Sequence, residues 1–251
     1  MAYDVTLQKH IRCKQGDVAE YVFIPGDPAR AERIAKTFDT YAKVAENREY
    51  VVYTGMKDGQ RLSVCSTGIG GPSTAIAIEE LAKIGAHTFI RVGSAGGRQE
   101  KIAVGSVVVV NAAIKGDGTS IAYLPAIYPA VADFAVTQAL MESAQALLGD
   151  EPFYVGTSFT RDAYYVQNQE LNEKFKNTDA AVSEMECATV FTVGSLRRLR
   201  TGAIVGTDSN ILLKTQLSLE EKDCLYAEAE RKTIQIAVQA ALKLAEADQN
   251  G

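Results

Sequence analysis

The sequence predicts a single α/β domain with a mainly parallel or mixed sheet, and three observations lead to that fold class. Short apolar runs alternate along the chain with longer amphipathic stretches. Glycines follow several of the apolar runs, as is typical of strand ends where ligands bind in α/β sheets. With 251 residues, 47% of them hydrophobic, the chain is long enough to bury one large core. We therefore expect one domain over residues 1–251.

The apolar runs and amphipathic stretches give the expected elements in order. Buried strands are expected at Tyr21–Pro25, Arg61–Ser66, Thr88–Val92, Ser106–Ala113 and Gly202–Thr207. Helices are expected at Pro28–Thr37, Pro72–Ile84, Ala130–Leu148, Cys187–Arg200 and Leu219–Ala247. Thr201-Gly202 is the expected C-terminal stop of the fourth helix. No repeat or linker marks a second domain.

Composition and charge exclude several classes of function. The net charge of -5 argues against general nucleic-acid binding, which requires a concentrated basic surface. The 4 cysteines have no CxxC spacing, and with 2 histidines they form no recognisable zinc site. The first ten residues lack the apolar run of a signal peptide, and no run reaches the roughly 18 residues that span a bilayer. We expect a soluble cytoplasmic protein with reduced thiols.

Two carboxylates around a methionine, Glu184-Met185-Glu186, are typical of a sugar site. An ionised carboxylate accepts hydrogen bonds only, so it suits two neighbouring hydroxyl groups that donate to it. The flexible thioether of Met185 suits packing against a sugar or a flat base. The alternative is an ordinary helix N-terminus, where acidic residues interact favourably with the helix dipole.

A second group of residues predicts an anion site. Gly26 allows a backbone amide to approach a ligand closely, and Pro28 opens a helix whose N-terminus favours anions, with Arg30 nearby. Arg91 lies inside an apolar strand, where an unpaired guanidinium is costly, and Ser94 follows in the same loop. A plain turn at Gly26 and a structural salt bridge at Arg91 are the alternatives. Neither glycine-rich loop is a Walker A or Rossmann fingerprint.

An oxyanion site together with a sugar diol site indicates phosphorolysis of a nucleoside. At this point the chain resembles a known family, the hexameric nucleoside phosphorylases, which include uridine phosphorylase and hexameric purine nucleoside phosphorylases. The resemblance runs from about His10 to Leu244. Its motifs are Pro25-Gly26-Asp27-Pro28-Ala29-Arg30, Asn47-Arg48-Glu49-Tyr50, Ser66-Thr67-Gly68-Ile69-Gly70-Gly71-Pro72-Ser73, Arg91-Val92-Gly93-Ser94 and Glu184-Met185-Glu186.

The resemblance implies a nucleoside phosphorylase-like, three-layer α/β/α single domain with a central mixed sheet. It also implies a homohexamer built as a trimer of dimers, in which His10 and Arg48 reach the site of the dimer partner. No organic cofactor or catalytic metal is implied, because inorganic phosphate is a co-substrate. Positions that bind potassium between subunits in uridine phosphorylases correspond to Glu49, Ile69 and Ser73.

The same resemblance implies a function for each matching site residue. Phosphate would be bound by Gly26, Arg30, Arg91 and Ser94, with Arg48 of the dimer partner. The ribose would be bound by Glu186, Met185 and the partner's His10, with Glu184 supporting the site. Tyr164 would stack against the base.

Two places in the sequence indicate whether the base is a purine or a pyrimidine. Uridine phosphorylases read uracil with a glutamine and an arginine, where this chain has Asn168 and Glu170. Purine phosphorylases have an aspartate where this chain has Asp208, and such an acid assists the departing purine at N7. The arginine that helps it in bacterial purine enzymes is missing from Asn210–Asp223, as it is in parasite-type purine phosphorylases. An Asx turn or helix cap is the alternative for Asp208.

The sequence therefore predicts reversible phosphorolysis of purine nucleosides to the free base and ribose 1-phosphate. Inosine and guanosine are the expected substrates, and adenosine is left open. Uridine phosphorylase is the nearest alternative, and a hydrolytic nucleosidase is disfavoured because it has no use for the phosphate arginines. A nucleoside-binding protein without turnover is the alternative from another class.

Overall fold

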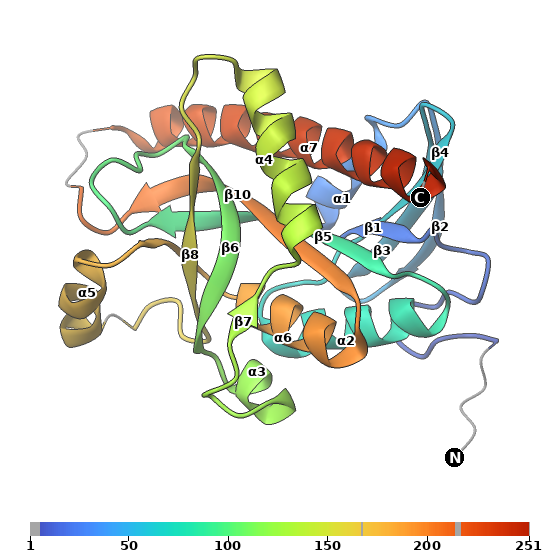
Figure 1. Cartoon of the computed structure of the whole chain (residues 1–251), viewed down its shortest axis with the longest axis horizontal. Coiled ribbons are helices and arrows are strands. Elements are labelled where there is room, and N and C mark those ends of the chain that lie inside the picture. Colours follow the sequence, from blue (N-terminus) through green and yellow to red (C-terminus); the bar gives the residue numbers. More distant parts are fainter. Residues whose placement is uncertain (1–5, 167, 214–216, 251) are drawn as a thin grey trace.

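The computed structural model describes residues 6–166, 168–213 and 217–250, which form a three-layer α/β/α arrangement (Figure 1). This confirms the predicted fold class. The strands are β1 (Tyr21–Phe23), β2 (Thr40–Asn47), β3 (Tyr50–Lys57), β4 (Gln60–Cys65), β5 (Thr88–Gly97), β6 (Val107–Gly116), β7 (Ala130–Val131), β8 (Tyr154–Arg161), β9 (Ala180–Glu184) and β10 (Arg200–Asn210). The helices are α1 (Pro28–Ala35), α2 (Gly71–Lys83), α3 (Gly118–Tyr123), α4 (Phe134–Leu148), α5 (Gln169–Lys176), α6 (Cys187–Arg197) and α7 (Leu219–Asn250).

The sheet is mixed and half of it closes on itself. β5 pairs with β10 in parallel, β10 with β6 antiparallel, and β6 with β8 in parallel. β8 pairs with β9 in parallel, and β9 returns to β5 antiparallel. These strands form a closed ring, while β1, β4, β3 and β2 continue from β5 as an open sheet. Closure of this kind removes free strand edges from that half.

Two hydrophobic cores lie on opposite faces of the sheet, because successive strand side chains point to opposite sides. Phe89 of β5 belongs to the core under α2 and α6, and its neighbour Ile90 belongs to the core under α1, α4 and α7. β10 repeats the pattern, with Ala203 and Val205 on the first face and Ile204 on the second. Figure 1 shows α4 and α7 covering one face, with α2 and α6 on the other.

Several element boundaries differ from the sequence predictions, and pairing partners explain most of them. β5 continues to Gly97 because β10 pairs with it up to Asn210 and β9 pairs with its last two residues. The expected loop after Val92 is therefore strand. The stretch expected to be one helix from Ala130 begins with the short strand β7, which pairs with β6, and helix α4 starts only after Asp133, which caps it.

Other elements were absent from the prediction. The hairpin of β2 and β3, the strands β7, β8 and β9, and the short helices α3 and α5 carry no long apolar run. Thr201-Gly202 is not the stop of α6 but part of β10. The helix instead ends at Arg197, and its C-cap Arg198 adopts the left-handed conformation with φ 56°. No helix in the described part of the chain has the length and apolar character needed to cross a membrane.

Candidate active site

A cavity of about 600 Å³ opens at the carboxyl ends of the parallel strands β1, β4, β5 and β10. This is where ligands bind in α/β sheets. The cavity contains most of the residues predicted from sequence. They are Gly26, Arg30, Arg91, Ser94, Tyr164, Glu184, Met185, Glu186 and Asp208. Those not predicted include Arg161, Tyr165, Ser183, Ser209 and Ile211.

Two glycine loops form one wall of the cavity by direct backbone contact. The amide of Gly68 donates to the carbonyl of Gly26 at 2.9 Å. A Cβ at Gly26 would lie 2.9 Å from the Gly68 carbonyl oxygen, so any other residue would push the loops apart. Asp27 caps α1 by accepting from the amides of Ala29 and Arg30, and Pro28 occupies the first turn. The helix N-terminus therefore faces the cavity, as the motif predicts.

Arg30 is held in place by α7, which sequence reasoning did not connect to the site. Its Nε donates to Glu230 Oε2 at 2.7 Å, its Nη1 donates to the Val92 carbonyl, and its Nη2 donates to the Tyr226 hydroxyl. Arg33 pairs with the other oxygen of Glu230. Burial alone would raise the pKa of Glu230, but Arg33 and Arg30 outweigh it and lower that pKa. Glu230 is thus an anion that positions Arg30.

Arg91 is paired within the protein, as the salt-bridge alternative states. Its Nη2 lies 2.5 Å from Glu186 Oε2, and its Nε lies 3.3 Å from Glu184 Oε2. Burial would lower the pKa of Arg91, but Glu186 and Glu184 raise it above its ordinary value. The remaining N–H groups of the guanidinium leave it able to bind a second anion. A Cβ at Gly93 would lie 2.8 Å from Nη2, so this glycine makes room for the guanidinium.

Glu186 combines burial with a limited set of partners. It is 5% exposed, and its Oε1 accepts from the Gly70 amide at 2.6 Å. Burial raises its pKa, against the attraction of Arg91. Each carboxylate oxygen can accept more than one hydrogen bond, so a diol that enters the cavity finds free acceptor positions. The geometry is compatible with the function that the resemblance implies.

Glu184 is committed to the protein on both oxygens. Oε2 accepts from the amides of Glu186 and Cys187 at 2.7 and 2.8 Å, which caps the N-terminus of α6. Oε1 accepts from the hydroxyls of Ser158 and Thr160 on β8. These bonds fill its acceptor positions and join β8, β9 and α6. Glu184 therefore positions Glu186 and Arg91.

Asp208 is the extra residue of a β-bulge. Thr207 pairs with Ala95 and Ser209 pairs with Gly96, so Asp208 has no partner on β5. Bulges redirect a side chain, and here the carboxyl lines the cavity. Burial raises the pKa of Asp208, and the Ser209 hydroxyl donates to it at 2.7 Å. An acid with a raised pKa is suited to proton donation.

The base end of the cavity is more exposed. Tyr164 and Tyr165 are 57% and 92% exposed and pack edge to face with ring centroids 5.0 Å apart. The two positions aligned with the uracil-reading pair act on α5 instead. Asn168 caps that helix by accepting from the Leu171 amide, and Glu170 pairs with Lys174.

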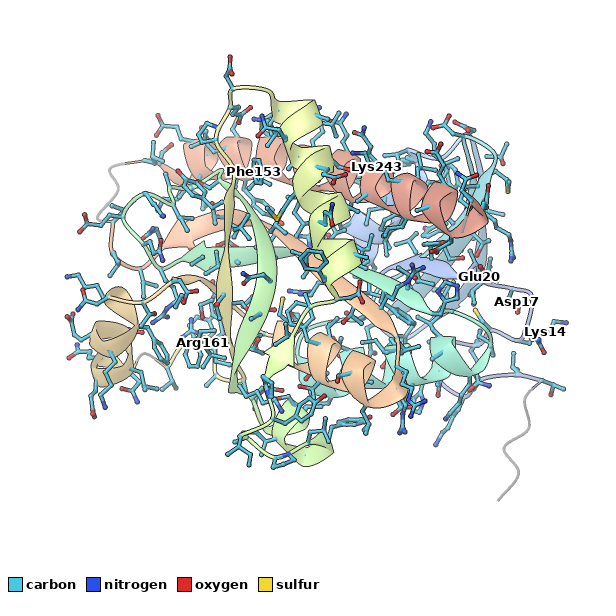
Figure 2. All side chains as sticks on the ribbon, viewed as in Figure 1. Lys14, Asp17, Glu20, Phe153, Arg161 and Lys243 are labelled. Carbon is cyan, nitrogen blue, oxygen red and sulfur yellow. The ribbon has the colours of Figure 1, made fainter. Side chains whose placement is uncertain are left out.

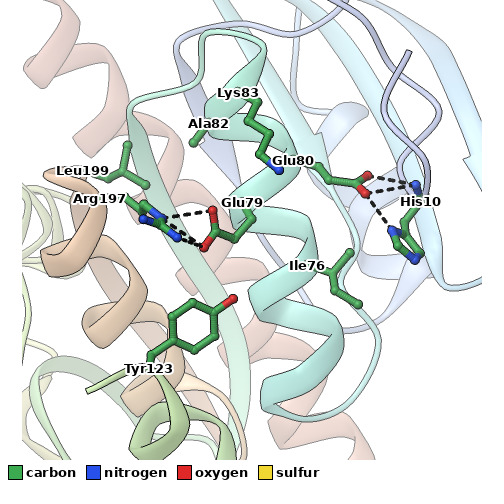
Figure 3. Close-up of a pocket in the computed structure, with 9 residues that line it drawn as sticks. All are labelled: His10, Ile76, Glu79, Glu80, Ala82, Lys83, Tyr123, Arg197 and Leu199. Carbon is green, nitrogen blue, oxygen red and sulfur yellow. Dashed lines mark hydrogen bonds and ion pairs between the residues drawn. The ribbon is translucent and has the colours of Figure 1, made fainter. Parts of the chain in front are cut away.

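His10 and Arg48 are the predicted site residues that do not line the cavity of their own chain. The His10 ring and its backbone amide both contact Glu80 of α2, with Nδ1 2.6 Å from Oε1 (Figure 3). Arg48 is exposed at the β2–β3 turn with φ 56°. The Asn47 side chain donates to the His10 carbonyl at 2.7 Å, so both segments lie on one surface.

The possible metal positions and the segment Asn210–Asp223 complete the description of the site. In residues 6–166, 168–213 and 217–250, no group of three or more His, Cys, Asp or Glu side chains is arranged to hold a metal ion. Of the potassium positions, Ser73 Oγ donates to the Ile69 carbonyl at 3.4 Å, and Glu49 packs against Gly68. The segment Asn210–Asp223 enters α7 at Leu219, and residues 214–216 within it lie outside the described residues.

The chain is similar to known proteins in family, sequence and structure. Residues 20–246 match the model of the phosphorylase superfamily. Uridine phosphorylase of Treponema pallidum is 42% identical over 96% of this chain and 95% of its own length. Guanosine phosphorylase of Halorubrum lacusprofundi is 39% identical over 94% of this chain and 99% of its own. The crystal structure of uridine phosphorylase from Vibrio fischeri superposes with a TM-score of 0.88 at 33% identity, covering 96% of this chain and 99% of that one.

Proposed function

The chain belongs to the phosphorylase superfamily, and from that premise we propose that it catalyses the reversible phosphorolysis of nucleosides to a free base and ribose 1-phosphate. The observation that carries the proposal is one cavity in which Arg30, Arg91 and Ser94 lie with the buried carboxylate Glu186. Arginines suit phosphate, and a carboxylate acceptor suits the ribose hydroxyls.

In the proposed reaction, phosphate bound by Gly26, Arg30, Arg91 and Ser94 attacks C1' of the ribose. The bond from C1' to the base nitrogen breaks, and its electron pair leaves with the base. Binding both reactants in register supplies much of the catalysis by positioning. Glu230 and Tyr226 support this step because they fix Arg30 before phosphate arrives. Phosphate is the co-substrate, and the reaction as proposed uses no organic cofactor or catalytic metal.

We assign 6-oxopurine nucleosides, inosine and guanosine, as the first candidate substrates. Asp208 supports this assignment, since the proton on its carboxyl neutralises the negative charge that the departing purine gains, at N7. The raised pKa of Asp208 keeps that proton at higher pH than an ordinary carboxyl would. The commitment of Asn168 and Glu170 to α5 also favours a purine, because neither is poised to read uracil.

Uridine is the second candidate, and the comparisons favour it over the first. Most of the similar curated proteins carry the name uridine phosphorylase, including those of Treponema pallidum and Thermococcus kodakarensis at 42% identity. The guanosine phosphorylase of Halorubrum lacusprofundi covers nearly the same length at 39% identity. Overall similarity therefore supports the shared reaction more strongly than it supports either base.

The proposed assembly is a homohexamer, a trimer of dimers, in which His10 and Arg48 complete the partner's site. Their absence from their own cavity supports it, as does their common surface. In this arrangement His10 binds the ribose 5'-hydroxyl and Arg48 binds phosphate.

Substitution of Arg48 by alanine should raise the KM for phosphate. The assembly would be contradicted if the wild-type protein were a monomer at assay concentration and the variant kept the wild-type KM for phosphate.

The deciding experiment assays the purified protein with inosine, guanosine, adenosine and uridine in parallel, with and without phosphate. Base release and ribose 1-phosphate are both quantified. The proposal expects cleavage only with phosphate, with inosine or guanosine cleaved fastest. Cleavage that is equally fast without phosphate would contradict phosphorolysis, and a much higher kcat/KM for uridine than for inosine would replace the first substrate by the second.

A further inference from the structure

Arg161 is a charged residue of the cavity to which neither the motifs nor the proposed reaction assigns a function. It is the last residue of β8 and is labelled in Figure 2. Its side chain is half-buried and lines the cavity. In the sheet order, β9 and β5 lie between β8 and β1, the strand that leads to the Gly26 loop. Arg161 is followed by the loop of Tyr164 and Tyr165. It therefore belongs to the base end of the cavity.

The guanidinium of Arg161 has donors to spare, and among the residues that the structure describes it has no counter-ion. Its Nη1 donates to the Val166 carbonyl at 3.0 Å. Across the described ranges, no carboxylate lies within ion-pair distance of this side chain. A partly buried guanidinium without an anionic partner is costly unless a ligand accepts its remaining N–H groups.

A second arginine, Arg98, lies close enough to Arg161 for their charges to interact. It adds to the positive field at this end of the cavity and does not neutralise it. Arg98 is 2% exposed, and its guanidinium carbon lies 5.3 and 5.5 Å from the ring centroids of Phe159 and Phe175. Its Nη2 donates to the Asn172 side chain, and its Nε has no hydrogen-bond partner. Burial lowers the pKa of Arg98, and so does the nearby charge of Arg161. Both arginines therefore favour electron-rich groups in the cavity.

A guanidinium only donates hydrogen bonds, so its ligand must present an acceptor. At the C6 edge, a 6-oxopurine presents the oxygen O6 beside N7, whereas a 6-aminopurine presents an amino donor there. We propose that Arg161 determines base specificity by donating to a ring carbonyl oxygen, so that 6-oxopurine nucleosides are accepted and 6-aminopurine nucleosides are disfavoured. This rests on the proposed phosphorolysis. In the reaction, the same hydrogen bond stabilises the negative charge that the leaving base places on that carbonyl oxygen.

The test removes the donor and the acceptor separately. Arg161→Gln is compared with the wild type on inosine and on purine riboside, which lacks the oxygen at C6. We expect kcat/KM for inosine to fall roughly 10- to 100-fold, as for a lost charge-assisted hydrogen bond. For purine riboside it should stay within about twofold, as should the KM for phosphate. Arg231→Gln, an exposed arginine of α7 that pairs with Glu228, is the matched control and should change neither value.

An equal loss on both nucleosides would overturn the proposal, because Arg161 would then act only by holding the loop at Val166. Melting temperatures of all variants check folding, and Arg161→Met repeats the comparison if Arg161→Gln is unfolded, with the same asymmetry expected because methionine also lacks a charged donor. If the wild type cleaves uridine and not inosine, the purine assignment fails, but the function of Arg161 can still be tested. The kcat/KM of Arg161→Gln is then measured on uridine and on the pyrimidine riboside that lacks the C4 oxygen. A far larger loss on uridine would support the proposal, and equal losses on both nucleosides would overturn it.

Discussion

Two walls of the same cavity differ in whether their charged side chains form ion pairs within the protein. In the paired wall, formed by Arg30, Arg91, Glu184 and Glu186, every charged group has an opposite charge within ion-pair distance, Glu230 being the partner of Arg30, and all are buried. In the unpaired wall, formed by Arg161, Tyr164, Tyr165, Asp208 and Ser209, no ion pair joins the described side chains, and the tyrosines are exposed.

The difference suggests that one wall binds the reacting phosphate and ribose, whereas the other wall determines which base is accepted. Buried, mutually paired charges are fixed before a ligand arrives, which suits the reacting phosphate and ribose. A wall whose described side chains form no ion pairs leaves more donors and acceptors for the ligand, so a few substitutions there should change specificity while the fold is kept. Relatives named for uridine and for guanosine, at 42% and 39% identity, are consistent with such a division.

The largest expected effect is in the paired wall. Arg91→Met leaves Glu184 and Glu186 buried without their cation, and breaking a buried pair in this way costs about 3–5 kcal/mol. The free energy of unfolding in urea should fall by that amount. Arg161→Met, in the unpaired wall, is the matched control and should lose far less stability. Equal losses would show that the two walls do not differ as described.

Asp208→Asn should have the next largest effect, on catalysis. We expect kcat/KM for inosine to fall by roughly 10²-fold, because the amide cannot deliver a proton to the departing base. The urea midpoint should stay close to that of the wild type, since Asp208 has no ion pair to lose. An unchanged rate would return Asp208 to the alternative of a turn residue.

The pH dependence of the inosine reaction tests the same carboxyl. Burial raises the pKa of Asp208 above its ordinary value of 3.8, so the protonated form persists to higher pH. The kcat/KM for inosine should therefore be highest below the raised pKa and decline as pH rises through it. Asp208→Asn should lack that declining limb. A limb that remains in the variant belongs to another group.

A smaller effect is expected from Glu230→Gln, which removes the anion shared by Arg30 and Arg33. The KM for phosphate should rise several-fold, since Arg30 loses a bond of the strength of a charge-assisted hydrogen bond. Because the pKa of Glu230 is lowered in the folded protein, its contribution to stability is present above its unfolded value near 4.5 and is lost as pH falls through the folded value. The variant should therefore show a smaller loss of stability on acidification. Identical acid titrations would contradict this.

The smallest effect is expected at Asn168. Asn168→Ala should cost about 1 kcal/mol or less, as for an exposed helix cap, and should leave kcat/KM for both inosine and uridine within about twofold. Amide exchange in α5 would detect the local loss. A large drop with uridine alone would mean that Asn168 reads the base.

The sequence predicted the paired wall better than the unpaired wall, for physical reasons. Arg91 is conspicuous because a charge inside an apolar strand requires a partner, although the pattern could not show that Glu186 and Glu184 provide one. Glu230 and Tyr226 lie about 200 residues from Arg30, on an amphipathic helix where nothing local distinguishes them. Arg161 is the last residue of β8, and that strand has no apolar run that would make its charge conspicuous.

The closed half of the sheet ties the existence of the site to pairing between segments that are far apart in the chain. Its seam joins β5 to β10, where Thr88 and Arg200 meet from 112 residues apart. Contacts of such long sequence separation carry a high entropic cost of closure and form slowly. Asp208 and Ser94 come to the same cavity only when that seam is complete. A chain that has assembled every other layer still lacks a working centre, so turnover measures completed folding of the whole molecule.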